Sequence, residues 1–184
     1  MLGKFLTTDN LINLGNKNKI IKKKFKGVFP ADYYPKIDFK EGGWIWNTDT
    51  SDKPGQHWVA AWKNGKNLYF FDSFGLTPEH YKNKRWKKFA TDKKLNFEIF
   101  SYKRRQNINK TTCGVWCLFF LLQKCLKMNI LNVINHNSTL DNDKKLLSLS
   151  KMFFPRIKKV YARKCKNEKK NTQICCSYKN IFKK

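Results

Sequence analysis

The clearest structural signal in the sequence lies in the sixteen residues from His57 to Asp72, HWVAAWKNGKNLYFFD. Two runs rich in aromatic and branched side chains flank Asn64-Gly65. This pair is favoured in two-residue type I′ turns because both central positions need a positive φ. An antiparallel hairpin is therefore expected. With Asn64 and Gly65 as its turn, His57 falls directly opposite Asp72, and opposed residues have Cβ atoms about 4.5–5.5 Å apart on one face.

This predicted pairing places an imidazole beside a carboxylate. A carboxylate that accepts a hydrogen bond from one ring nitrogen fixes the tautomer of the histidine and leaves the other nitrogen to act as a base. Two other interpretations stay open at this point. A surface His57–Asp72 pair without a chemical role explains the same residues, and a β-bulge would shift the register.

A candidate nucleophile stands at the start of an apolar helix predicted over residues 113–127, with Thr112 as its N-cap. The exposed N–H groups and macrodipole of a helix N-terminus stabilise an anion, and a nearby imidazolium has the same effect, so both lower the pKa of a thiol. Cys113 is therefore a candidate thiolate. The alternative is a buried structural cysteine, which is the interpretation given to Cys117 and Cys125 on the same helix.

Further elements are expected within a single domain over residues 1–162, followed by a basic, mobile tail over 163–184. They are predicted from hydrophobic period, capping residues and Gly/Pro punctuation. They comprise a helix over 8–14 capped by Thr7 or Thr8 and ended by Gly15, an extended stretch over 25–35, a strand over 41–46, a helix over 78–88 with a basic face (Lys82, Lys84, Lys87 and Lys88), a strand over 97–102, a polar loop over 104–112 and a helix over 143–153.

The chain is strongly basic, with 39 Lys and Arg against 13 Asp and Glu and a formal net charge of +26. A field of this sign predicts binding to a polyanion, and nucleic acid is the expected partner. Because 34 of the 39 are Lys, which meets phosphate as a point charge, binding is expected to be salt-sensitive and independent of sequence. An AT-rich coding sequence would also enrich Lys, but it should raise Asp and Glu as well, and these are scarce.

Several classes of protein are disfavoured by the same sequence. The longest apolar run, over 115–122, is too short for the roughly 20 residues of a membrane span, and the N-terminus lacks the apolar core of a secretory signal. The six cysteines show no disulfide framework and the three histidines stand alone, which disfavours a zinc site. We therefore expect an intracellular protein in a reducing compartment, without membrane association, metal or cofactor.

The order of the candidate residues resembles the adenovirus protease family. Members carry a His-Trp pair, then a carboxylate followed by x-Phe-Gly, then a glutamine seven residues ahead of a Cys-Gly dipeptide. Here these elements are GQHWVAAW with His57, YFFDSFG with Asp72, and Gln106 seven residues before Cys113 in CGVWC. The opening stretch FKGVFPADYYP is also similar, and the resemblance covers roughly residues 5–160.

The resemblance implies a fold and four residue roles. The fold is α+β, a small mixed β-sheet with helices on both faces, of the adenovirus-protease and ubiquitin-like-protease type. The helix that starts at Cys113 would meet the sheet edge that carries His57. Cys113 would be the nucleophile and His57 the general base that later protonates the leaving amine. Asp72 would orient the histidine, and Gln106 would donate to the oxyanion together with the backbone N–H of Cys113.

The resemblance also implies partners and a place of action. It implies a monomer that cleaves viral precursor proteins during virion maturation, commonly after small residues, in the virion and the infected cell, at the nucleus or assembly site. DNA is a family activator and agrees with the basic charge. The adenovirus enzyme bonds its peptide activator through a cysteine where this chain has Leu95, so a peptide activator here is expected to bind without that disulfide. Asp72 stands where that enzyme has Glu.

Two competing functions remain open. A protease specific for ubiquitin-like modifiers shares the order of His, Asp, Gln and Cys, although its glutamine usually lies six residues before the cysteine and Asp precedes Cys-Gly. Here the spacing is seven, and Thr112 precedes Cys113. A basic nucleic-acid-packaging protein would explain the charge but would leave the ordered set of four residues to chance.

Overall fold

The structure is a computed structural model that describes residues 6–134, 138–155 and 157. These residues contain a mixed sheet of five strands in the order β1-β2-β3-β4-β5. The outer pairs are parallel, and the two inner pairs are antiparallel. The strands are β1 (Phe25–Phe29), β2 (Glu41–Asn47), β3 (Trp58–Asn64), β4 (Asn67–Phe71) and β5 (Asn96–Ile99).

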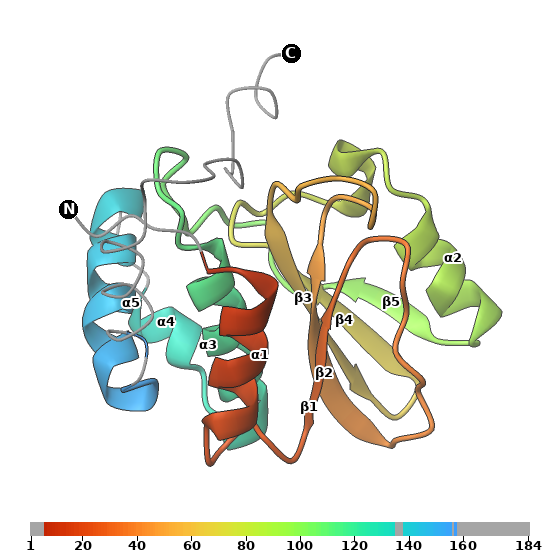
Figure 1. Cartoon of the computed structure of the whole chain (residues 1–184), viewed down its shortest axis with the longest axis horizontal. Coiled ribbons are helices and arrows are strands. Elements are labelled where there is room, and N and C mark those ends of the chain that lie inside the picture. Colours follow the sequence, from red (N-terminus) through yellow and green to blue (C-terminus); the bar gives the residue numbers. More distant parts are fainter. Residues whose placement is uncertain (1–5, 135–137, 156, 158–184) are drawn as a thin grey trace.

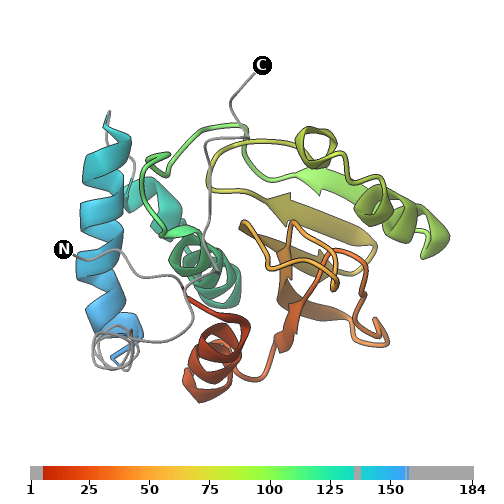
Figure 2. The same ribbon diagram turned by 45° about the horizontal axis from the view of Figure 1, so that its top comes forward.

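Helices cover both faces of this sheet, as Figure 1 and Figure 2 show. The helix α3 packs directly on the sheet, and α5 packs on α3. The predicted α+β fold is confirmed. One face carries α1 (Thr8–Lys17), α3 (Cys113–Leu126), α4 (Ile130–Val133) and α5 (Thr139–Phe153), and the other carries the 3-10 helix η1 (Pro78–Tyr81) and α2 (Arg85–Asp92).

The sheet separates two hydrophobic cores. Along β2, Trp44 and Trp46 pack with Phe89 of α2, whereas Ile45 joins the core on the α3 face. This follows from the strand geometry, because successive side chains point to opposite faces. The helix α3 is buried on all sides over residues 113–123, as expected of an apolar helix in the centre of a domain.

The β3–β4 hairpin forms, but its predicted register is wrong. Asn64 pairs with Asn67, so the turn residues are Gly65 and Lys66 rather than Asn64 and Gly65. Gly65 has a φ of 57° in the first turn position, where a type II′ turn places its glycine. Asn64 remains in the strand because it is paired on both sides, also with Glu41 of β2.

The corrected register keeps His57 and Asp72 on one face of the sheet. It moves every β3 residue by two positions along β4, so that His57 lies diagonal to Asp72 rather than directly opposite it. Because side chains alternate with a period of two, an even shift preserves the face. Diagonal neighbours have Cα atoms about 7–8 Å apart, which their side chains can still bridge.

The helix predicted over residues 78–88 is two elements. The first is η1, after which Lys82 adopts a left-handed conformation with a φ of 52° and interrupts the helical path before α2 begins. The predicted basic face does point outward, because all four of its lysines are exposed. Two of them form ion pairs with neighbouring acidic residues.

Other boundaries differ by a few residues. The helix α1 is capped by Thr7 but continues past Gly15 to Lys17. The helix α5 begins four residues earlier than predicted because Ser138 caps it, its hydroxyl accepting a backbone N–H. The strand predicted over 97–102 is the shorter β5.

No helix among residues 6–134, 138–155 and 157 is long and apolar enough to cross a membrane. The predicted domain end at residue 162 and the predicted tail over 163–184 lie outside the described residues.

Candidate active site

The two candidates from the hairpin lie just beyond its strand ends. His57 immediately precedes β3, and Asp72 immediately follows β4. The Nε2 atom of His57 lies 2.7 Å from Oδ1 of Asp72, and neither side chain is exposed. The structure therefore brings the predicted imidazole and carboxylate together.

The Asp72 carboxylate accepts hydrogen bonds from three groups besides His57. Its Oδ1 accepts from the backbone N–H of Phe74 at 2.9 Å. Its Oδ2 accepts from the backbone N–H of Leu76 at 3.2 Å and from the hydroxyl of Tyr81 at 2.7 Å. Both oxygens are thus held in place, so the orientation of the carboxylate does not depend on the imidazole that it contacts.

Two aromatic rings cover His57, and the sequence analysis assigned a role to neither. Phe74 stacks on the imidazole with ring centroids 4.7 Å apart, and Tyr81 stacks at 5.8 Å. Burial, together with the charge of Asp72, raises the pKa of Tyr81 well above its usual range, so its hydroxyl remains a donor. Phe74 is the phenylalanine of the x-Phe-Gly element, so a sequence signal for it exists. No sequence signal pointed to Tyr81.

Cys113 is the first residue of α3 and interacts with His57. Burial alone would lower the pKa of His57. The charge and hydrogen bond of Asp72, followed by the hydrogen bond and charge of Cys113, more than offset this effect and raise the pKa to about 9. The imidazole therefore carries a proton at neutral pH, between a carboxylate and a sulfur. Cys113 itself is only 1% exposed.

The environments of the other described cysteines favour the neutral thiol. Burial raises the pKa of Cys117 well above its usual range and that of Cys125 to about 11. Both are free cysteines and remain thiols at neutral pH. Their interpretation as structural residues agrees with this environment.

Gln106 is fully buried, and both ends of its side-chain amide are engaged. Its Oε1 accepts from the hydroxyl of Ser73 at 2.7 Å, and its Nε2 donates to the backbone carbonyl of Lys110 at 2.7 Å. An amide group carries two N–H donors, so the bond to Lys110 uses only one of the two donors on Nε2.

Asp143 of α5 holds both ends of the loop that leads into α3. Its carboxylate accepts from the backbone N–H of Asn107 at 2.8 Å, the hydroxyl of Thr112 at 2.6 Å and the indole N–H of Trp116 at 2.9 Å. Thr112 is the N-cap residue of α3, as predicted, but its side chain makes no capping hydrogen bond because its hydroxyl donates to Asp143 instead. Asp143 was not predicted as a site residue, because no local sequence pattern connects it to this loop.

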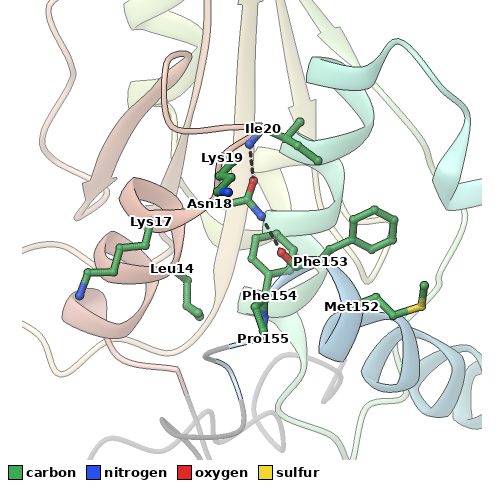
Figure 3. A pocket seen from close by; sticks show the side chains of 9 residues that line it. All are labelled: Leu14, Lys17, Asn18, Lys19, Ile20, Met152, Phe153, Phe154 and Pro155. Atoms are coloured by element: carbon green, nitrogen blue, oxygen red, sulfur yellow. Dashed lines mark hydrogen bonds between the residues drawn. The ribbon is translucent and has the colours of Figure 1, made fainter.

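Among the described residues, no group of three or more His, Cys, Asp or Glu side chains could hold a metal ion. Figure 3 shows a pocket between α1 and the end of α5, whose lining includes none of the four candidate residues. Its lining residues are Leu14, Lys17, Asn18, Lys19, Ile20, Met152, Phe153, Phe154 and Pro155.

Comparisons with known proteins point to viral proteases. No protein-family model matches the chain. Over 88 residues, however, the sequence is 35% identical to a protein named "Protease" from bovine adenovirus 2, a match that covers 42% of this chain and 42% of that protein. The resemblance to adenovirus proteases is confirmed. The chain matches less than half of the length of that viral protein.

A solved structure supports the fold. The crystal structure of the ASFV pS273R protease aligns with a TM-score of 0.57 and 18% sequence identity, over 82% of this chain and 67% of that chain. The expected adenovirus-protease and ubiquitin-like-protease type of fold is therefore confirmed.

Proposed function

We propose that this protein is a viral cysteine endopeptidase that cleaves viral precursor proteins during virion maturation. The observation that carries the proposal is that three side chains from different parts of the sequence interact in the folded chain. His57 contacts Asp72 at 2.7 Å and also interacts with Cys113 at the N-terminus of a helix. A nucleophile, a base in reach of it and a third group that orients the base are the parts that covalent catalysis needs.

The proposed reaction begins with the proton of Cys113 on His57. Because Nε2 of His57 contacts Asp72, Nδ1 is the ring nitrogen that exchanges a proton with the sulfur. The thiolate attacks the scissile carbonyl, and the tetrahedral oxyanion accepts from Gln106 and from the backbone N–H of Cys113. As this intermediate collapses, the C–N bond breaks and His57 protonates the departing amine.

Hydrolysis of the thioester completes the cycle. His57, now neutral, takes a proton from a water molecule whose oxygen attacks the thioester carbonyl. The second tetrahedral intermediate collapses with cleavage of the C–S bond, which releases the carboxylic acid. The Cys113 thiolate and the His57 imidazolium are then restored, so no metal or cofactor enters the proposed cycle.

The substrate class separates this proposal from its main alternative, a protease for ubiquitin-like modifiers with the same type of fold. We expect the purified chain to cleave a peptide with small residues at the scissile bond with a higher kcat/KM than a ubiquitin-like fusion protein. The similarity to an adenovirus protease supports this order. Both substrates should be measured on the same enzyme preparation, and a clear preference for the fusion would favour the alternative.

Nucleic acid is the proposed stimulating partner, because the chain carries a formal net charge of +26. We expect DNA affinity to fall steeply with salt, by about 10³–10⁵-fold between roughly 50 and 200 mM if 6–10 phosphates are contacted. Fluorescence anisotropy with duplexes of unrelated sequence measures this dependence. A methylphosphonate oligonucleotide, which lacks the backbone charge, is the control and should not bind. Affinity that is unchanged over this salt range would contradict the proposal.

The remaining expectations concern assembly and place, and they stand as proposals. We propose a monomer that acts in the virion and in the reducing interior of the infected cell, at the nucleus or the site of assembly. A peptide activator, where one takes part, would bind without a disulfide at position 95, because that residue is Leu95.

A further inference from the structure

Ser73 lies immediately after Asp72 and joins it to the segment that carries Gln106. Its side chain is fully buried. Its backbone carbonyl accepts from the N–H groups of Arg105 at 2.8 Å and Gln106 at 3.0 Å. Its hydroxyl donates to Oε1 of Gln106 at 2.7 Å. Three hydrogen bonds therefore join the residue next to Asp72 to the segment that carries Gln106, and one of them reaches the Gln106 side chain.

The Ser73 hydroxyl and the Lys110 carbonyl together select one orientation of the Gln106 amide. A carbonyl can only accept, so the group that faces Lys110 must be Nε2, and Oε1 must then face Ser73. The hydroxyl meets that oxygen as a donor. A flipped amide would set two acceptors against each other at Lys110 and would turn an oxygen toward the developing oxyanion.

The turn that contains Ser73 is packed tightly against the chain that precedes Gln106. The backbone N–H of Gly75 donates to the carbonyl of Asp72 at 3.0 Å and closes the turn. Gly75 has a φ of 71°, and a Cβ atom there would lie 2.3 Å from the carbonyl oxygen of Tyr102. Only glycine permits this approach, so the distance between the two segments is fixed by the backbone.

We propose that Ser73 is a positioning residue that orients the side-chain amide of Gln106 for the oxyanion and keeps it in register with Asp72. This inference rests on the proposed function. In this role Ser73 acts through Gln106 and not on the substrate itself. It acts by holding the second Nε2 donor of Gln106 toward the position that the oxyanion occupies, which is the preorganisation that makes such donors effective.

The test is a double-mutant cycle between Ser73 and Gln106, with kcat and KM measured on a peptide substrate. We expect Gln106→Ala to lower kcat by about 10²–10³-fold, the usual effect of losing one oxyanion donor. Ser73→Ala should lower kcat by about 10-fold, a tenth or less of that loss, with KM unchanged. In the Gln106→Ala background the same Ser73 substitution should change kcat by less than about twofold, because its effect passes through the amide.

Matched controls separate positioning from general stability. Ser150→Ala removes another buried serine hydroxyl, which donates to the Leu147 carbonyl at 2.7 Å in α5, and it should leave kcat unchanged. Thermal unfolding shows whether Ser73→Ala folds. If it does not, Ser73→Cys is the second variant, because cysteine is similar in size to serine and keeps a weak donor. Its kcat should fall by less than the loss expected for Ser73→Ala.

Two outcomes would overturn the assignment of Ser73. One is an undiminished kcat in Ser73→Ala, and the other is that Ser73→Ala lowers kcat equally in the wild-type and Gln106→Ala backgrounds. Cleavage that survives Cys113→Ala would instead overturn the proposed function, so the two failures are distinguishable.

Discussion

Replacement of Cys113 by alanine is expected to abolish peptide cleavage while the protein still folds. The loss in kcat should approach the roughly 10⁶-fold effect that removal of the nucleophile has in a serine protease. The physical reason is that the nucleophile is lost and no other described thiol can replace it. Burial raises the pKa of both Cys117 and Cys125, so neither supplies a thiolate at neutral pH. Cleavage of a fluorogenic peptide measures activity, and thermal unfolding checks the fold.

Cys117→Ala is the matched control for this experiment. Cys117 lies one turn further along the same helix, and like Cys113 it is buried. It should retain near-wild-type cleavage, because its side chain serves packing. Equal losses in the two variants would show that a cysteine-to-alanine change in α3 damages the fold rather than the chemistry, and would contradict the assignment of Cys113.

The second large effect is expected from Asp72→Asn. We predict a fall in kcat of about 10⁴-fold, the size of effect seen when the orienting aspartate of a catalytic triad becomes an asparagine. Asparagine presents one acceptor oxygen where Asp72 uses two, and its NH₂ group would face donors such as the Tyr81 hydroxyl. The imidazole of His57 would lose both its orientation and the charge that stabilises its protonated form. Steady-state kinetics and thermal unfolding together measure the change.

Tyr81→Phe serves as the control for Asp72→Asn. It removes one donor to the Asp72 carboxylate but keeps the ring that stacks on His57. A single hydrogen bond of this kind contributes about 0.5–3 kcal/mol, so the expected loss in activity is far below 10⁴-fold. If Asp72→Asn loses no more activity than Tyr81→Phe, the carboxylate does not orient the catalytic histidine.

The hairpin was predictable from sequence because its signal is local, whereas its register was not. The Asn-Gly preference indicated a tight turn between two strands, and that turn exists. Whether Asn64 belongs to the turn or to the strand depends on its partner Glu41 in β2, which a local pattern does not contain. The His57–Asp72 prediction survived because the register error was an even number of residues and so preserved the face of the sheet.

The sequence indicated four candidate residues but not the network of contacts around them. Spacing and resemblance indicated Gln106, yet the two contacts that orient its amide come from Ser73 and the Lys110 backbone. Asp143 and Tyr81 are held near the site by tertiary packing of α5 and η1. Neither residue carries a sequence signal, because the contacts that give each one its role span segments whose relative positions only the folded chain defines.

Alkylation by iodoacetamide at about pH 6, with the modified cysteines identified by mass spectrometry, tests directly whether Cys113 is a thiolate activated by His57. At this pH a thiol with an ordinary pKa of about 8.5 is less than about 1% thiolate. We expect Cys113 to react faster than the other five cysteines, and we expect this advantage to disappear in His57→Ala. Alkylation of Cys113 no faster than that of the other cysteines, or at an unchanged rate in His57→Ala, would contradict it.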